Sequence, residues 1–88
     1  MDDRRKRLKF RAWRRGFREI DLILGGFADR WLVDLSDSDL DAFEALMKVP
    51  DNDVYDWITD AAEAPPEYNT PVLARLRAFR LELKKPDA

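Results

Sequence analysis

The chain has 88 residues, of which 45% are hydrophobic, 11% aromatic and 39% charged, and its formal net charge is −2. This length allows one domain at most, and the apolar content is higher than that of a disordered chain. The longest apolar stretch, residues 22–28, contains two glycines and is too short to cross a bilayer, so we expect no membrane insertion. The chain has no Cys and no His, which excludes disulfides, thiol nucleophiles, imidazole bases and the usual zinc sites.

The amino-acid content also indicates whether the chain can catalyse a reaction or bind a metal ion, and where in the cell it is expected. Without His or Cys we predict no catalytic residue and no enzyme that works alone. Two Asp-rich segments begin like calcium loops at Asp37 and Asp51, but both lack Gly at the sixth position and Glu at the twelfth. We therefore predict no metal site. The chain begins without the apolar core of a signal peptide, and Asp2 and Asp3 are unlike an acid-poor transit peptide, so we expect a protein of the bacterial cytoplasm.

Charge is unevenly distributed along the chain. Residues 1–19 hold nine Lys or Arg and three acids, residues 20–64 hold two bases and twelve acids, and residues 65–88 hold five bases and three acids. A basic segment can bind nucleic acid, an anionic membrane or an acidic protein, or it can be a solvated helix face that offsets the acidic middle. Because the acidic middle would repel phosphate over most of the surface, we do not expect nucleic acid as a partner.

Apolar residues recur at helical spacing throughout, and no segment alternates with a period of two. This pattern predicts an all-α fold, a compact five-helix bundle of short amphipathic helices that forms one domain over residues 1–88. The expected helices cover residues 3–15, 17–33, 37–48, 53–61 and 71–84.

Local signals mark some helix ends more clearly than others. Ser36 is a suitable N-cap for the third expected helix, and Asp51 or Asp53 for the fourth. Gly25 and Gly26 lie inside the second expected helix, where each costs about 1 kcal/mol relative to Ala. The sequence leaves open whether these glycines allow close helix packing or a bend.

The segment from Trp13 to Asp21 departs from a plain amphipathic pattern. Gly16 follows two arginines where one expected helix ends and the next begins. Glycine there can serve backbone geometry alone, or its missing side chain can let a partner's backbone or a cofactor approach closely. In the second case Arg15 would offer a bidentate fork to a carboxylate or phosphate. Glu19, four residues later, would either orient Arg15 or meet a basic group on the partner.

Residues 15–19, Arg-Gly-Phe-Arg-Glu, match the RGxxE motif of the SdhE family of FAD assembly factors, whose mitochondrial counterparts assemble succinate dehydrogenase. The chain resembles that family further in residues 35–37 (Leu-Ser-Asp), in Phe43 and in residues 51–57 (Asp-Asn-Asp-Val-Tyr-Asp-Trp). The resemblance covers nearly the whole chain in the same order. The Ala-Pro-Pro link at residues 64–66 is more similar to the mitochondrial members than to the enterobacterial ones.

The resemblance implies a five-helix bundle that acts as an assembly chaperone. Members of this family bind the flavoprotein subunit of succinate dehydrogenase, and often of fumarate reductase, and promote covalent attachment of FAD. The bond joins a His of the partner to the flavin 8α-methyl carbon, which agrees with a helper that has no His. Arg15, Gly16 and Glu19 would lie at the contact surface, and FAD would be bound by the partner. We expect a monomer, with a weak dimer through exposed aromatic residues as the alternative.

Two other functions stay open at this stage. Residues 4–18 could form a basic helix that binds nucleic acid or neutralises a toxin, and its binding to phosphate would weaken steeply with salt. A membrane-surface helix could instead use Phe10, Trp13 and the arginines. Co-sedimentation with anionic liposomes would identify this last case.

Overall fold

The computed structural model describes residues 2–84. These residues form five α-helices, two short 3-10 helices and no strand, so the predicted all-α, five-helix architecture is confirmed. In chain order the elements are α1 (Asp3–Ala12), α2 (Arg18–Trp31), η1 (Leu32–Asp34), α3 (Asp37–Met47), α4 (Asp51–Ile58), η2 (Pro66–Tyr68) and α5 (Pro71–Lys84).

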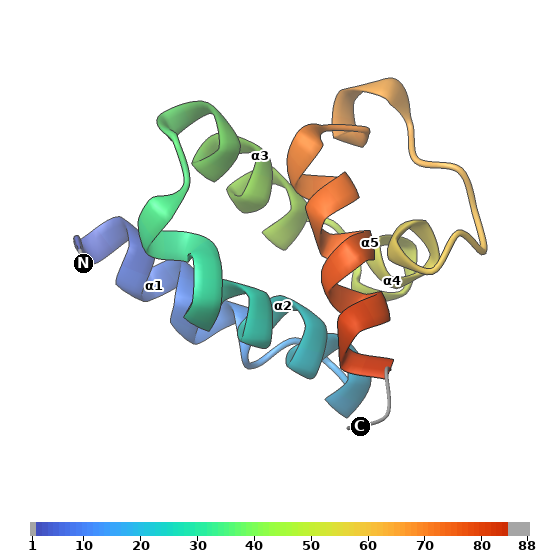
Figure 1. Cartoon of the computed structure of the whole chain (residues 1–88), viewed down its shortest axis with the longest axis horizontal. Coiled ribbons are helices and arrows are strands. Elements are labelled where there is room, and N and C mark those ends of the chain that lie inside the picture. Colours follow the sequence, from blue (N-terminus) through green and yellow to red (C-terminus); the bar gives the residue numbers. More distant parts are fainter. Residues whose placement is uncertain (1, 85–88) are drawn as a thin grey trace.

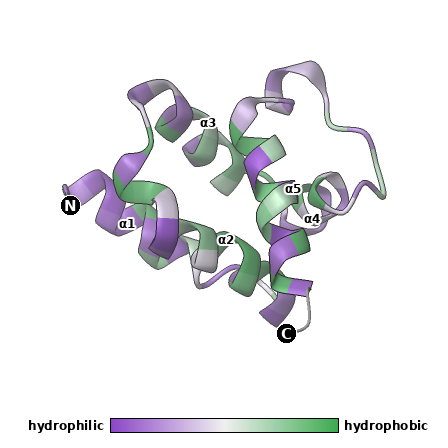
Figure 2. Ribbon diagram, in the orientation of Figure 1, coloured by the Kyte–Doolittle hydropathy of each residue, from purple (hydrophilic) through white to green (hydrophobic). Residues whose placement is uncertain are grey.

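The helices pack around one apolar core. α1 and α2 lie side by side, and α5 packs against α2, α3 and α4 (Figure 1). Phe27 and Phe43 are fully buried with their rings stacked 5.9 Å apart, and the Phe79 ring meets Phe27 edge-on at 6.0 Å. Figure 2 shows long hydrophobic stretches on α2, whereas α1 is mostly hydrophilic and buries only Leu8 and Ala12. α1 therefore covers one side of the core with few buried side chains and a mostly polar surface.

The junction between α1 and α2 differs from the expected one. The helix expected over residues 3–15 ends at Ala12, and the one expected from residue 17 begins at Arg18. The backbone leaves the helix at Trp13, and the Arg15 N–H donates to Asp21 Oδ1 at 2.7 Å instead of to a helical carbonyl. Residues 13–17 thus form an irregular connection, which we call the Gly16 corner.

The start and end of α4 also differ from the expected ones. Pro50 is the N-cap residue and α4 begins two residues early, so the prediction that Asp51 or Asp53 caps this helix was wrong. The helix ends at Ile58 rather than at residue 61, because Asp60 adopts a left-handed backbone with φ of 61°. The Asp51 side chain is consequently free to contact another part of the molecule.

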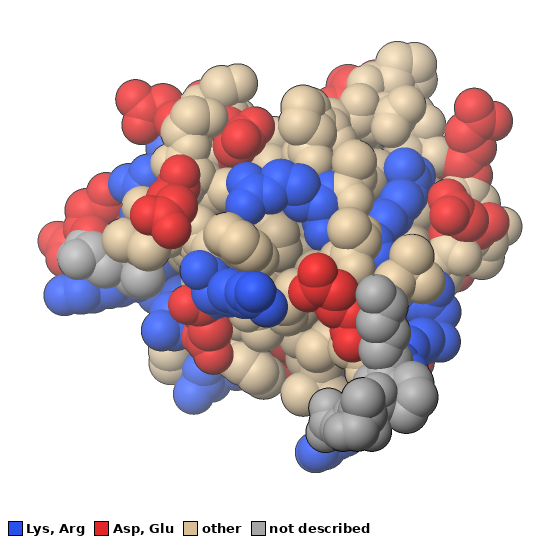
Figure 3. Space-filling view, in the orientation of Figure 1, with Lys and Arg blue, Asp and Glu red and all other residues tan. Residues whose placement is uncertain are grey.

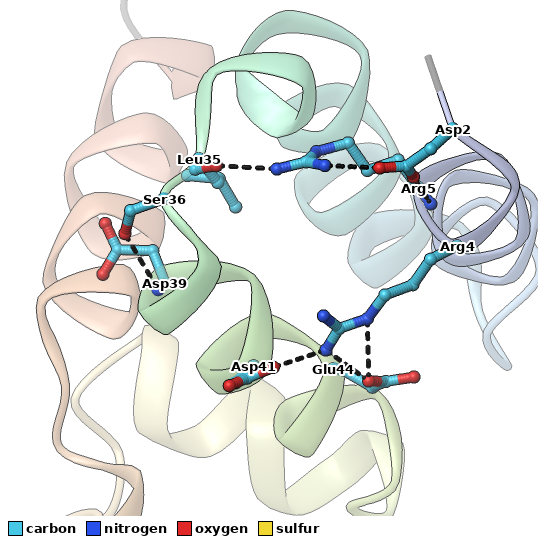
Figure 4. Close-up of polar contacts among 8 residues, drawn as sticks. All are labelled: Asp2, Arg4, Arg5, Leu35, Ser36, Asp39, Asp41 and Glu44. Carbon is cyan, nitrogen blue, oxygen red and sulfur yellow. Dashed lines mark hydrogen bonds and ion pairs between the residues drawn. The ribbon is translucent and has the colours of Figure 1, made fainter.

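The other helix ends are close to the expected ones. The hydroxyl of Ser36 accepts a hydrogen bond from the Asp39 N–H at 3.1 Å, which confirms the predicted cap of α3 (Figure 4). α3 ends at Met47, one residue early, and α5 covers residues 71–84 as expected. α2 stops at Trp31 and passes into η1, so the last two residues of the helix expected over 17–33 form a tighter turn.

The two glycines of α2 serve close packing rather than a bend. A Cβ on Gly25 would collide with the indole ring of Trp13, whereas a Cβ on Gly26 would approach only the far edge of the Phe79 ring, at 3.2 Å. The indole lies on bare backbone and donates its Nε1–H to Asp29 Oδ1 at 3.1 Å. Gly25 therefore provides the surface on which the first residue of the Gly16 corner rests.

We expect Gly25→Ala to lower the free energy of unfolding by about 1–3 kcal/mol, because a rigid ring must move to admit the methyl group. Gly26→Ala is the matched control. Gly26→Ala likewise replaces a helical glycine, which costs about 1 kcal/mol relative to alanine, and its methyl group meets only the edge of the Phe79 ring. Its free energy of unfolding should therefore stay within about 1 kcal/mol of the wild-type value. Chemical denaturation of the two variants checks this. Equal stabilities would contradict the role given to Gly25.

Candidate functional site

Arg15 points into the molecule rather than out of it. Its side chain is only 10% exposed. Nη1 donates to the Met47 carbonyl at 2.5 Å and Nη2 to the Val49 carbonyl at 2.7 Å, while Nε lies 2.7 Å from Asp51 Oδ1 as an ion pair. Met47 ends α3 and Asp51 begins α4. Arg15 therefore fastens the Gly16 corner to the junction between α3 and α4.

This arrangement follows from the needs of the helix ends. The Met47 carbonyl at the end of α3 has no helical donor and carries partial negative charge, which a guanidinium satisfies. The Val49 carbonyl lies in the link after α3 and binds the same guanidinium. The Asp51 carboxylate then balances the buried cation. The sequence suggested that the Arg15 guanidinium would bind a partner's carboxylate, but it binds groups of the chain itself. Arg15 therefore influences the surface by holding the Gly16 corner in place.

Gly16 lies directly above this ion pair and is exposed. None of the glycines has a positive φ, so Gly16 is not required for a left-handed backbone. A Cβ at this position would instead collide with the carboxylate of Asp51. Glycine is needed because the Asp51 carboxylate fills the space on the inner side of residue 16. On the outer side, the absence of a side chain leaves the backbone exposed.

Glu19 is exposed in the first turn of α2 and faces α4 rather than Arg15. The Glu19 carboxylate beside the Tyr55 hydroxyl, assisted by partial burial, raises the pKa of that phenol above its ordinary value. The Phe17 ring meets the Tyr55 ring edge-on at 5.3 Å. The exposed side of the corner therefore combines bare backbone, a carboxylate and an aromatic pair.

We expect Glu19→Gln to lower the pKa of Tyr55 toward its ordinary value, because the neighbouring negative charge disfavours the phenolate. The ultraviolet absorbance of tyrosinate measures this in a Tyr68→Phe background, where Tyr55 is the only tyrosine. The folded-state pKa is the higher one, so the stability from this contact is complete below the unfolded-state pKa and is lost as the pH rises through the folded-state value. An unchanged titration would show that Glu19 and Tyr55 do not interact.

Three residues of the site were not predicted from the sequence. Asp21 accepts the Arg15 N–H, Asp51 pairs with the Arg15 guanidinium, and Tyr55 contacts Phe17 and Glu19. One signal was present, because Asp51 and Tyr55 lie in the segment 51–57 that carried part of the family resemblance. Their contact with the corner spans more than thirty residues and has no local pattern.

The surface next to Glu19 contains a small groove. This groove of about 170 Å³ is lined by Glu19, Leu22, Ile23, Arg80, Leu83 and Lys84. Sites for small molecules usually have about 300–1,000 Å³, so this groove is smaller than such a site. Within residues 2–84 no three Asp or Glu side chains are grouped to hold a metal ion, and no helix is long and apolar enough to cross a membrane.

Comparison with known proteins places the chain in a family. The family model described as flavinator of succinate dehydrogenase matches residues 6–80, which include Arg15, Gly16 and Glu19. The mitochondrial succinate dehydrogenase assembly factor 2 of Dictyostelium discoideum is 41% identical over 69 residues, which is 78% of this chain and 49% of that protein. The FAD assembly factor SdhE of Acetobacter pasteurianus is 37% identical over 73 residues, 83% of this chain and 67% of that protein.

A third relative, the mitochondrial succinate dehydrogenase assembly factor 2 of Danio rerio, is 35% identical over 81 residues, 90% of this chain and 51% of that protein. The chain spans about half the length of the two mitochondrial relatives and two thirds of the bacterial one. The matches confirm the resemblance read from the RGxxE motif. The chain belongs to the family of flavinators of succinate dehydrogenase.

Proposed function

We propose that this chain binds the flavoprotein subunit of succinate dehydrogenase and promotes the covalent attachment of FAD to it. The observation that carries the proposal is the family match over residues 6–80 together with the exposure of Gly16 on a corner that Arg15 holds from beneath. The relatives are named for FAD assembly and for succinate dehydrogenase assembly. The corresponding subunit of fumarate reductase is a second candidate partner.

The three motif residues have different roles in this proposal. Gly16 offers bare backbone to the partner, and Glu19 offers a carboxylate next to the Tyr55 ring. Arg15 is a positioning residue, because its guanidinium is occupied by Met47, Val49 and Asp51. A corner held rigid before binding loses little conformational entropy when the complex forms.

The chain promotes flavin attachment by positioning alone. It binds the flavoprotein and holds its mobile capping domain so that the partner's His and the flavin are correctly oriented. Orientation of two reacting groups can lower a barrier by several kcal/mol, up to about 7–11 kcal/mol in favourable cases. FAD stays on the partner throughout. The absence of His from this chain is consistent with a helper that neither gives nor takes a proton.

The work of the chain takes place, in this proposal, in the bacterial cytoplasm before the enzyme complex is complete. One relative is bacterial, and the eukaryotic relatives are named as mitochondrial. The proposal needs only one copy of the chain, because the corner is complete within a single molecule.

Co-expression of the flavoprotein subunit with and without this chain tests the function. Covalent flavin is measured as fluorescence in a denaturing gel, and total flavoprotein by staining. We expect several-fold more covalent flavin per flavoprotein when the chain is present, and a stable complex in pull-down at moderate salt. Equal flavin fluorescence in both samples, or capture of nucleic acid or a toxin in place of a flavoprotein, would contradict the proposal.

A further inference from the structure

The outward side of α1 carries a cluster that the proposed function does not use. Five residues are all exposed: Lys6, Arg7, Phe10 and Arg11 on α1, and Arg14 in the Gly16 corner just after it. We call them the outer face of α1. Phe10 is 59% exposed, and Lys6 and Arg14 line a groove together with it. Figure 3 shows Lys and Arg side chains along the lower left margin of the molecule, over this helix.

The inward cations of α1 are used differently. Arg4 Nη2 pairs with Asp41 and with Glu44, each at 2.6 Å, and Arg5 donates to the Leu35 carbonyl at 2.8 Å (Figure 4). Arg5 also donates to the Leu32 carbonyl at 3.0 Å. These contacts join α1 to η1 and α3. In contrast, the four cations of the outer face form no ion pair with any carboxylate among residues 2–84. No ion pair within the described part of the chain therefore holds these four side chains, and Arg11 acts on the Glu44 carboxyl only through space, where it helps Arg4 to lower the pKa of that group.

Phe10 is held in an exposed position. The Arg14 guanidinium lies 3.7 Å from the centre of the Phe10 ring, and Nη1 of Arg14 donates to the Phe10 carbonyl at 3.2 Å. A groove of about 490 Å³ runs past Phe10, and Lys6, Trp13 and Arg14 help to line it. Exposed aromatic and Arg side chains that are already ordered are typical of the residues that dominate protein interfaces.

We propose that the outer face of α1 is a docking surface for an acidic protein surface that places an apolar group against Phe10. α1 leads directly into the Gly16 corner, and Arg14 lies only two residues before Gly16, so the two surfaces are continuous. The inference rests on the proposed function, because the acidic surface is then part of the flavoprotein subunit. The cations steer the encounter, and Phe10 slows the separation of the complex.

The remainder of the molecule favours a protein over the other acidic partners. Phe10 is the single exposed large apolar residue of α1, whereas a membrane-surface helix needs a broad apolar face. A long nucleic acid would meet twelve acids in residues 20–64 of a chain whose net charge is −2. A folded partner can match a short basic face and avoid the acidic remainder.

The test is the rate of association with the purified flavoprotein subunit at about 50 and about 200 mM salt. The double variant Arg7→Gln with Arg11→Gln should associate about ten-fold more slowly at low salt and show a weaker salt dependence, with little change in dissociation. Phe10→Gln should instead speed dissociation several-fold. The matched control, Arg30→Gln with Lys48→Gln, removes the same charge at exposed positions on α2 and after α3 and should behave like the wild type.

Three outcomes overturn the inference. If the outer-face and control variants associate at the same rate while Gly16→Leu still abolishes binding, the outer face has no role and the proposed function stands. If the wild type does not bind the flavoprotein subunit, both fall together. If the Arg7→Gln, Arg11→Gln variant loses binding to vesicles of phosphatidylglycerol, or to single-stranded DNA, but not to the flavoprotein, the partner class is wrong.

Discussion

Gly16→Leu is expected to abolish binding to the flavoprotein subunit, and with it covalent flavin loading, while the helical fold is retained. The substitution puts a branched side chain on the exposed corner and prevents close approach of the partner's backbone. It also pushes the Asp51 carboxylate, which fills the inner side of Gly16, away from Arg15. In-gel flavin fluorescence and pull-down measure the loss, and circular dichroism measures the helix content. Normal flavin loading by this variant would contradict the close-approach mechanism.

A second substitution separates the two effects at Gly16. In an Asp51→Ala background the inner collision no longer exists, so Gly16→Ala should cost little stability there. If Gly16 only makes room for Asp51, then Gly16→Leu with Asp51→Ala will bind the flavoprotein as well as Asp51→Ala alone. Our account predicts that the double variant stays folded and still fails to bind, because its outer side remains blocked.

Arg15→Met is expected to lower the free energy of unfolding by about 2–4 kcal/mol, because it leaves the Met47 and Val49 carbonyls without their donor and the Asp51 carboxylate without its ion-pair partner. For a domain of this size that is a fall of about 8–32 °C in melting temperature. Thermal unfolding followed by circular dichroism checks it.

Two comparisons show whether this loss comes from the internal contacts of Arg15. Arg14→Met removes the same charge from an exposed neighbour and should change the melting temperature by only a few degrees. Arg15→Lys keeps the charge but cannot reach both carbonyls and the carboxylate at once, so it should fall between the two. If Arg14→Met and Arg15→Met were equally stable, the internal contacts of the Arg15 guanidinium would not stabilise the fold.

The helices could be predicted because each buries one stripe of its own residues. The apolar period is a local property, so the five helices and the Ser36 cap follow from neighbouring positions. α5 is the clearest case, with bounds that agree with the predicted range. The ends of α1 and α4 could not be predicted, because they depend on contacts between distant segments. Trp13 rests on Gly25, and Asp51 is used by Arg15 rather than as a cap.

The candidate site shows the same limit more sharply. Arg15, Gly16 and Glu19 could be selected from the motif, but the side to which each one points could not. On a continuous helix Arg15 and Glu19 would lie on one face, four residues apart. The chain leaves the helix after Ala12, so Arg15 turns inward to the end of α3 and Glu19 turns outward beside Tyr55.

Amide hydrogen exchange of the chain, free and in complex with the flavoprotein subunit, tests the central claim most directly. The claim is that the bare backbone of the Gly16 corner is the surface that the partner covers. Our account predicts slower exchange in the complex at residues 13–19, with Gly16 among the most strongly affected. Exchange at these residues that is the same in both samples, with protection confined to α3 or to the far side of α5, would contradict it.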